Sequence, residues 1–208
     1  MNRQESVESR SYTFPEDPNA RYVVDILRDT DAENPRAEHD HLGILAIPRS
    51  NRYISGDDNA PDSVEDINQA LRMDAYAALP VYAYIHSGIT ISTGQFSCPW
   101  DSGQVGYIYA TRADVRRAFK VSDGKRLPAR KKVRKILQAE IDELDAYLTG
   151  DVFGYVVTRM EENDENDEDE DDVTNGEAVD SCWGFYGDME YVTEAGRASA
   201  EYHAKHNI

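Results

Sequence analysis

The chain has little cysteine, little lysine and no long apolar run. Its 208 residues include 2 cysteines, and its 22 basic residues comprise 16 arginines and 6 lysines. No stretch approaches the roughly 18 consecutive apolar residues that a membrane helix needs, and Met1 leads into no apolar segment. We therefore expect neither a signal peptide nor a membrane anchor, and we expect a soluble protein of the cytoplasm.

Several classes of site are missing as well. Two cysteines are too few for a disulfide framework, and in a reducing cytoplasm both are thiols, with one bridge between Cys98 and Cys182 as the alternative. No Cys-x-x-Cys pair anchors a zinc site, and no glycine-rich loop followed by Lys-Ser or Lys-Thr indicates a P-loop. We expect no bound metal and no cofactor.

An excess of acid dominates the composition. The chain has 40 Asp and Glu residues, and its net charge is −18 at pH 7. One interpretation is adaptation to a salty, halophile-like cytoplasm, which abundant acid and scarce lysine suit. The other is mimicry of nucleic acid, in which carboxylates take the place of phosphates on a DNA-binding enzyme. The charge bears on solubility and on partners rather than on the fold.

Half of the basic residues lie in one short segment. Residues 112–135 hold 11 Lys and Arg and 2 Asp, a net charge of +9, which leaves −27 for the rest of the chain. From Glu161 to Asp172, ten of twelve residues are acidic, and we predict a disordered acidic loop over 161–176. The basic segment either binds phosphates or an acidic partner, or is neutralised by that loop. Its candidate binding residues are Arg116, Arg117, Arg130, Lys131, Lys132 and Lys135.

Hydrophobic periodicity predicts an α+β fold with a mixed, largely antiparallel sheet and two to four helices. Apolar residues at steps of three and four predict a helix over 128–148 that ends at Gly150. Further helices are expected over 62–79, capped by Asp62 with Glu65, over 113–119 and over 189–204. The expected strands are 22–27, 42–47, 81–85, 89–92, 105–110, 152–158 and 181–186. We predict a single domain over 19–208 after a flexible N-terminal arm over 1–18.

The densest motif is HSGITISTGQFSCPWDSGQVGYIY, which starts at His86, and DSCWGFYG from Asp180 echoes its Ser-Cys, Trp and Gly. Its chemistry permits a cysteine nucleophile, with Cys98 as thiolate, His86 as base and Asp101 or Asp180 as the orienting carboxylate. The spacing matches no local signature of cysteine enzymes. The alternative is that both cysteines are small core residues beside packed Trp rings.

The echo between the two motifs suggests that they are neighbours in the fold. On that expectation, the candidate binding residues around them are Trp100, Gln104, Asp180, Cys182 and Trp183. A metal site from two cysteines and a histidine is a weaker alternative, because its ligands are scattered singly.

Four blocks carry a resemblance to a known family: NPR at 34–36 with DHLG at 40–43, the long motif from His86, LTGDVFGYVV from Leu148, and DSCWGFYG from Asp180. In these blocks, over about residues 20–190, the sequence resembles an uncharacterised family of reading frames in bacteriophages, prophages and other mobile elements. The resemblance implies a mobile-element origin and assigns no activity and no catalytic residue.

Three functions follow as hypotheses. The first is a non-enzymatic accessory protein of a virus or mobile element, which acts in the host cell cytoplasm by binding a host or viral protein; an acidic inhibitor of a DNA-binding or defence protein is one form of it. The second is a small hydrolase or transferase that uses Cys98 and His86. The third is nucleic-acid binding through residues 112–135, which the net charge disfavours. The oligomeric state is left open.

Overall fold

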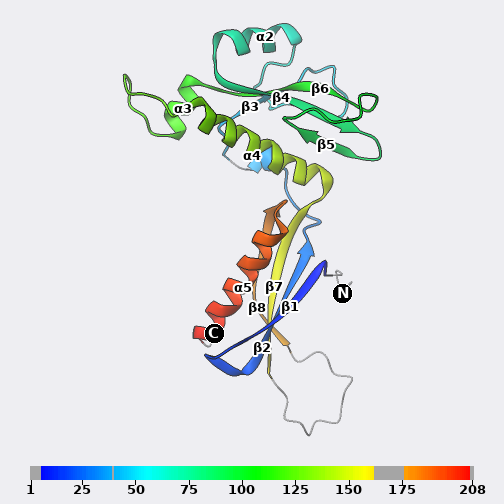
Figure 1. Ribbon diagram of the computed structural model, residues 1–208, viewed down its shortest axis with the longest axis vertical. Helices are drawn as coiled ribbons and strands as arrows, with labels where there is room; N and C mark the ends of the chain where they lie inside the picture. The colour runs from blue at the N-terminus through cyan, green and yellow to red at the C-terminus, as the bar shows by residue number, and fades with distance from the viewer. Residues whose placement is uncertain (1–5, 39, 162–175, 207–208) are drawn as a thin grey trace. The chain divides into compact units, whose positions relative to one another are not determined.

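The chain divides into two compact units. The computed structural model describes residues 6–38, 40–161 and 176–206. Unit 1 takes in Met1–Ala32 and Gly150–Ile208, and unit 2 is Glu33–Thr149. Each unit has its own four-stranded antiparallel sheet and its own core (Figure 1). The predicted α+β class with antiparallel strands is therefore confirmed, but the strands form two sheets where the sequence suggested one.

In its described residues, unit 1 is a sheet with one helix packed on one face. Its strand order is β1-β2-β7-β8, and helix α5 packs on β2 and β7. Alternate residues of β2, among them Tyr22, Val24 and Ile26, are fully buried beneath the helix. The elements are β1 (Glu8–Phe14), β2 (Asp17–Arg28), β7 (Val152–Glu161), β8 (Gly176–Tyr186) and α5 (Met189–His206).

Unit 2 places helices on both faces of its sheet, whose strand order is β3-β6-β4-β5. Helix α4 packs across one face, and the shorter α2 covers part of the other face (Figure 1). The elements are α1 (Pro35–Glu38), β3 (Ile44–Ala46), α2 (Val64–Met73), β4 (Ala75–Ile85), β5 (Ile89–Ser92), β6 (Ser102–Thr111), α3 (Arg112–Ala118) and α4 (Arg130–Thr149).

Helix α4 follows its sequence pattern closely. Val133, Leu137 and Ile141 are fully buried at steps of four residues, as a helix with one apolar stripe requires. The chain leaves the helix through Gly150, whose φ of +74° is a conformation that glycine adopts without strain. The apolar spacing and the terminal glycine were therefore sufficient to predict both the helix and its end.

The helix expected over 62–79 is shorter than predicted, and its cap is different. Helix α2 ends at Met73, and its N-cap is Ser63, whose hydroxyl accepts from the Asp66 amide at 3.1 Å, rather than Asp62. Residues 75–80 begin strand β4, because pairing with β6 outweighs the helical preference of an Ala-rich segment. Pro80 is tolerated there because β5 pairs with β4 only from Tyr82 onward.

The N-terminal arm expected over 1–18 contains a strand. Residues 8–14 form β1, which pairs antiparallel with β2, and Asp17 is already the first residue of β2. On β1 the side chains of Ser9, Arg10, Ser11 and Thr13 are exposed, whereas Tyr12 and Phe14 pack against the core of unit 1. The predicted acidic loop over 161–176 lies, apart from its end residues Glu161 and Gly176, outside the described residues.

Candidate functional site

One part of unit 2 is almost free of charge. Residues 75–111 number 37 and contain one charged side chain, Asp101, whereas the chain average of 30% corresponds to about eleven. This segment is β4, β5 and β6 with their connections, and it includes the long motif from His86. A stretch this poor in charge, within a chain of net charge −18, needs an explanation beyond solubility.

The outward face of these three strands carries aromatic and small polar side chains. In the antiparallel register Tyr84 lies between Thr90 and Ser102, and Tyr82 lies between Ser92 and Gln104. Directly paired residues point to the same side of a sheet, so the six side chains form two rows on one face. The intervening residues Val81, Ala83 and Ile91 point to the other side, into the core beneath α4. We call this surface the uncharged face; its six residues are Tyr82, Tyr84, Thr90, Ser92, Ser102 and Gln104.

Helix α2 leaves the uncharged face open. Ile67 and Ala70 of α2 pack on Ala46 and Tyr109, in the half of the sheet nearer to β3. None of the six residues of the uncharged face belongs to that cluster or to the core beneath α4. Because α2 is only ten residues long, it packs on the half of the sheet nearer to β3; on the uncharged face Gln104 is exposed and the other five side chains are half-buried.

The connection between β5 and β6 adds aromatic rings beside the face. The Phe96 ring lies 5.9 Å from that of Tyr84, and Gln95 Nε2 donates to Tyr82 Oη at 3.3 Å. The His86 ring, from the turn between β4 and β5, stacks on Tyr84 at 6.3 Å. Trp100, at the end of this connection, is 91% exposed. Such an exposed indole is unusual for a ring that usually buries most of its surface.

The edges of the same sheet are less open than its face. On β3, the Leu45 amide donates to Asp57 Oδ2 at 2.8 Å, and the Asp57 amide donates to the Leu45 carbonyl. On β5, the Ile91 amide donates to Asp145 Oδ1 of α4 at 2.7 Å. On each edge strand, outward-pointing backbone groups are thus already hydrogen-bonded within the chain. This disfavours pairing with a strand of a partner protein.

The proposed cysteine site is assembled only in part. Cys98 Sγ lies 3.6 Å from Asp101 Oδ2, while the His86 ring packs on Tyr84 and makes no hydrogen bond with Cys98 among the described residues. The arrangement therefore lacks the cysteine–base contact that nucleophilic catalysis needs.

The second motif belongs to unit 1, so it is not part of the uncharged face. Asp180, Cys182 and Trp183 lie on β8, and both cysteines of the chain are free. The Trp183 ring lies against Gly154, where a Cβ would come within 2.2 Å of it. Trp100 thus lies in the β5–β6 connection of unit 2 and Trp183 on β8 of unit 1, and neither unit contains both motifs.

Asp180 has a structural role within unit 1. Its carboxylate accepts from Tyr155 Oη at 3.1 Å and from the Ser199 hydroxyl, which ties β8 to β7 and to α5. Burial is the main cause that raises the pKa of Tyr155. The hydroxyl therefore stays protonated and donates to the carboxylate at neutral pH.

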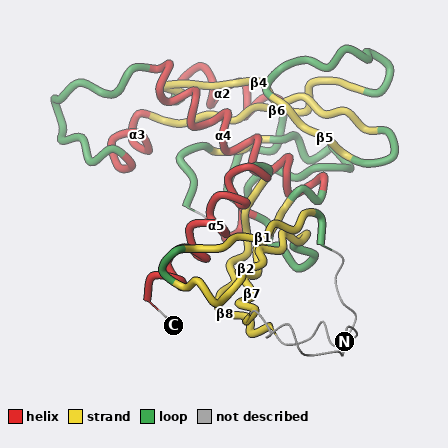
Figure 2. Tube along the Cα trace, turned by 60° about the horizontal axis from the view of Figure 1, so that its bottom comes forward, coloured by secondary structure: helices red, strands yellow, loops and turns green. Residues whose placement is uncertain are grey.

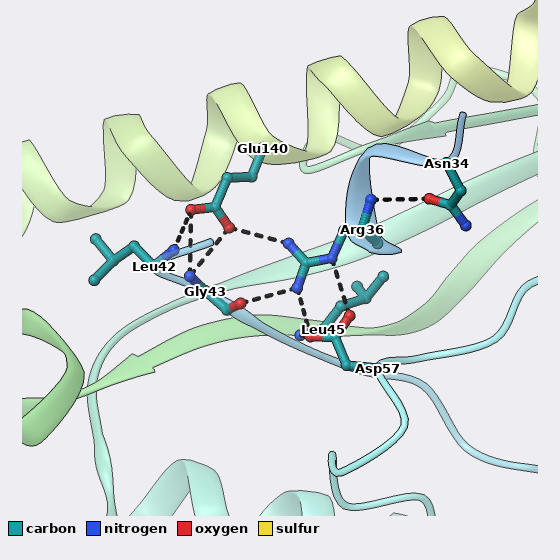
Figure 3. A network of polar contacts seen from close by, with 7 residues as sticks. All are labelled: Asn34, Arg36, Leu42, Gly43, Leu45, Asp57 and Glu140. Atoms are coloured by element: carbon teal, nitrogen blue, oxygen red, sulfur yellow. Dashed lines mark hydrogen bonds and ion pairs between the residues drawn. The ribbon is translucent and has the colours of Figure 1, made fainter. Parts of the chain in front are cut away.

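The blocks at 34–36 and 40–43 serve the fold of unit 2. Arg36 binds Asp57 through two of its nitrogens and Glu140 through a third, at 3.1 Å, and it donates to the Gly43 carbonyl at 2.9 Å (Figure 3). The Glu140 carboxylate also accepts from the Leu42 and Gly43 amides at 2.8 and 3.0 Å. We call this the Arg36 network. It joins the chain before β3 to α4 and satisfies its buried charges.

The predicted basic residues all lie in unit 2. Arg116 and Arg117 are on α3, where they pair with Asp123 and Asp114. Arg130, Lys131, Lys132 and Lys135 lie in the first two turns of α4, and no described acid pairs with them.

Tyr82, Tyr84 and Phe96 are the site residues that sequence reasoning missed. The signal that could have found them was the lack of charge over 75–111, rather than the cysteines and tryptophans of the motif. Among the residues that the structure describes, no group of three or more His, Cys, Asp or Glu side chains could hold a metal ion. Within the same residues, no helix has the length and apolar character to cross a membrane.

Comparisons with known proteins add no relative. No protein-family model, no curated protein and no solved structure matches the chain. The function therefore has to be argued from the geometry of the uncharged face and of the residues around it.

Proposed function

We propose that the chain is a non-enzymatic accessory protein of a virus or mobile element, and that it binds a host or viral protein in the cytoplasm through the uncharged face and Trp100. The observation that carries the proposal is the combination of one charge in 37 residues with a half-buried, aromatic sheet face and the 91% exposed ring of Trp100. The cores of protein interfaces are depleted in charge and enriched in Tyr, Trp and Phe.

The partner surface follows from the chemistry of the face. Tyr82, Tyr84 and Phe96 offer rings, and the Ser, Thr and Gln side chains offer short hydrogen-bonding groups, so a weakly charged, partly apolar protein surface fits best. Trp100 can insert into a pocket of the partner as an anchor. An indole at the centre of an interface typically accounts for about 2 kcal/mol or more of binding free energy, or about 30-fold in Kd.

Two other functions receive less support from the geometry. An acidic inhibitor that mimics nucleic acid would need acids on its binding surface, and the uncharged face has none beyond the neighbouring Asp101. A cysteine hydrolase would need a base within reach of Cys98, and His86 packs on Tyr84 instead. The scarcity of charged residues over 75–111 also has no role in either function.

Photocrosslinking in the native cells tests the proposal and identifies the partner. A photoreactive p-benzoylphenylalanine replaces Tyr84 on the uncharged face or, as a matched control, Tyr53, which is 61% exposed elsewhere in unit 2. We expect one discrete adduct with another protein from position 84, its loss when Trp100→Ala is added, and no such adduct from position 53. Adducts of equal yield from both positions, or an adduct only with a second copy of the chain, would overturn the proposal.

A further inference from the structure

The basic segment 112–135 forms one end of unit 2. It comprises α3, the loop that follows it and the first turns of α4, and it lies at the opposite end of the unit from the β5–β6 connection (Figures 1 and 2). This second surface is thus separate from the uncharged face. It also differs from the rest of the chain in how its charges are paired.

Outside this segment, most cations are neutralised by the chain itself. Of the ten Lys and Arg residues there that the structure describes, seven form an ion pair with an acid: Arg10, Arg28, Arg36, Arg49, Arg159, Arg197 and Lys205. This is the expected result for a chain with 40 acids against 22 bases. A cation in such a chain rarely lacks an acid nearby.

Inside the segment, the described residues show the opposite. Only Arg116, at 3.8 Å from Asp123, and Arg117, at 2.7 Å from Asp114, have an acidic partner. The other nine cations have none among the residues that the structure describes. We call these nine the basic surface: Arg112, Lys120, Lys125, Arg126, Arg130, Lys131, Lys132, Arg134 and Lys135.

Two guanidinium groups of the basic surface are held against one ring. Arg112 and Arg130 each lie 5.3 Å from the centroid of Tyr76, and Tyr76 Oη donates to the Pro128 carbonyl at 2.7 Å, which fixes the ring. Each cation–π contact contributes about 0.5–1 kcal/mol at an exposed site. The ring thus keeps two like charges close together with their nitrogens available to an external anion.

The basic residues at the start of α4 oppose local stability. Its first turn contains Arg130, Lys131 and Lys132 and no acid, although the helix dipole disfavours cations there by about 0.3–1 kcal/mol each. Lys131, Arg134 and Lys135 then stand at spacings of three and four residues, where like charges repel. An external polyanion would offset both costs.

We propose that the basic surface binds the phosphate backbone of duplex nucleic acid. Guanidinium groups pair with phosphates through two hydrogen bonds at once, and the charges extend over a helix and a loop rather than converging on one small anion. The segment's single aromatic residue, Phe119, is half-buried and carries Lys132 over its ring at 5.0 Å, so it offers no platform for base stacking. The contact is with backbone, and it is independent of base sequence.

The net charge of −18 sets the conditions for this binding. Acids elsewhere in the chain repel a polyanion, but at about 0.1 M salt the repulsion is screened beyond about 10 Å. Direct phosphate contacts at the basic surface persist at that ionic strength and weaken as more salt competes with them. Binding is therefore expected near 0.1 M salt and lost at higher salt.

Fluorescence anisotropy with short duplex DNA and duplex RNA tests the inference. One variant combines Lys131→Ala, Arg134→Ala and Lys135→Ala, and the charge-matched control combines Arg21→Ala, Arg52→Ala and Arg72→Ala, which are exposed and without an acidic partner among the described residues. For duplex DNA, log K falls as log salt rises, and each lost phosphate contact makes this slope shallower by about 0.9. We expect the first variant to have a slope shallower by about 3 and to bind either duplex about tenfold or more weakly. We expect the control to bind as the wild type does.

Several results would overturn the inference. These are no binding of either duplex by the wild type near 0.1 M salt, equal losses in the two triple variants, or equally tight binding of polyglutamate, which would assign the surface to carboxylates. A preference for one duplex identifies which nucleic acid is bound. Trp100→Ala is expected to leave duplex binding unchanged, so failure here is distinguishable from failure of the proposed function.

Discussion

Glu140→Ala tests how the Arg36 network holds unit 2 together. The Glu140 side chain is 10% exposed and that of Arg36 is 8% exposed, so the substitution leaves a buried guanidinium with Asp57 as its remaining carboxylate. It also leaves the Leu42 and Gly43 amides without their acceptor. Breaking a buried pair by removing one partner costs about 3–5 kcal/mol, and each orphaned amide adds about 1 kcal/mol or more. Because Asp57 still compensates Arg36, we expect a total loss of about 3–5 kcal/mol.

Native-state hydrogen exchange measures this loss separately for each unit. Because the two units have separate cores, peptides from β3, β6 and α4 should lose protection by about a hundredfold to a thousandfold or more, while peptides from β2 and β7 should be unchanged. Asp142→Ala removes an exposed acid from the same helix and should cost about 0.5 kcal/mol. A Glu140→Ala variant that behaves like Asp142→Ala, or a loss of protection that is equal in both units, would refute this role of the Arg36 network.

Two further predictions concern titratable groups. The hydrogen bond from Arg159 holds the pKa of Asp17 below its ordinary value. The stabilisation that this pair gives to unit 1 is therefore present above about pH 4 and is lost as pH falls through the folded pKa. Asp17→Asn should destabilise unit 1 by about 1–3 kcal/mol at pH 7 and far less in acid unfolding near pH 2. Cys98 should react with iodoacetamide at neutral pH no faster than Cys182, because His86 packs on Tyr84 and does not contact the Cys98 sulfur; rapid alkylation of Cys98 alone would revive the catalytic hypothesis.

Sequence patterns predicted several helices and strands correctly because neighbouring residues alone determine those elements. The apolar spacing from Val133 to Leu144 and the glycine at 150 define α4 without reference to the rest of the fold. Strand β4 was misread at 75–80 because Ala, Tyr and Leu suit a helix equally well, and only pairing with β6 decides. Strand β1 was missed for a similar reason, since its polar residues face solvent and its pairing with β2 is tertiary.

The division into two units had no local signal. Unit 1 is built from both ends of the chain, and β2 pairs with β7 across more than a hundred residues, for example Tyr22 with Arg159. The candidate site was predictable only in part. Trp100 and Gln104 were named from the motif, but the direction in which Tyr82 and Tyr84 point depends on which face of β4 packs on α4.

The affinity for the crosslinked partner, measured by isothermal titration calorimetry, tests the claim that the uncharged face and Trp100 bind it. We expect Trp100→Ala to raise Kd by about 30-fold or more, Tyr53→Ala to leave it unchanged, and the wild-type Kd to vary little between about 0.1 and 1 M salt, because the uncharged face makes no ion pairs. Wild-type affinity in Trp100→Ala, or an affinity that collapses as salt rises, would contradict the claim and assign binding to the acidic surface instead.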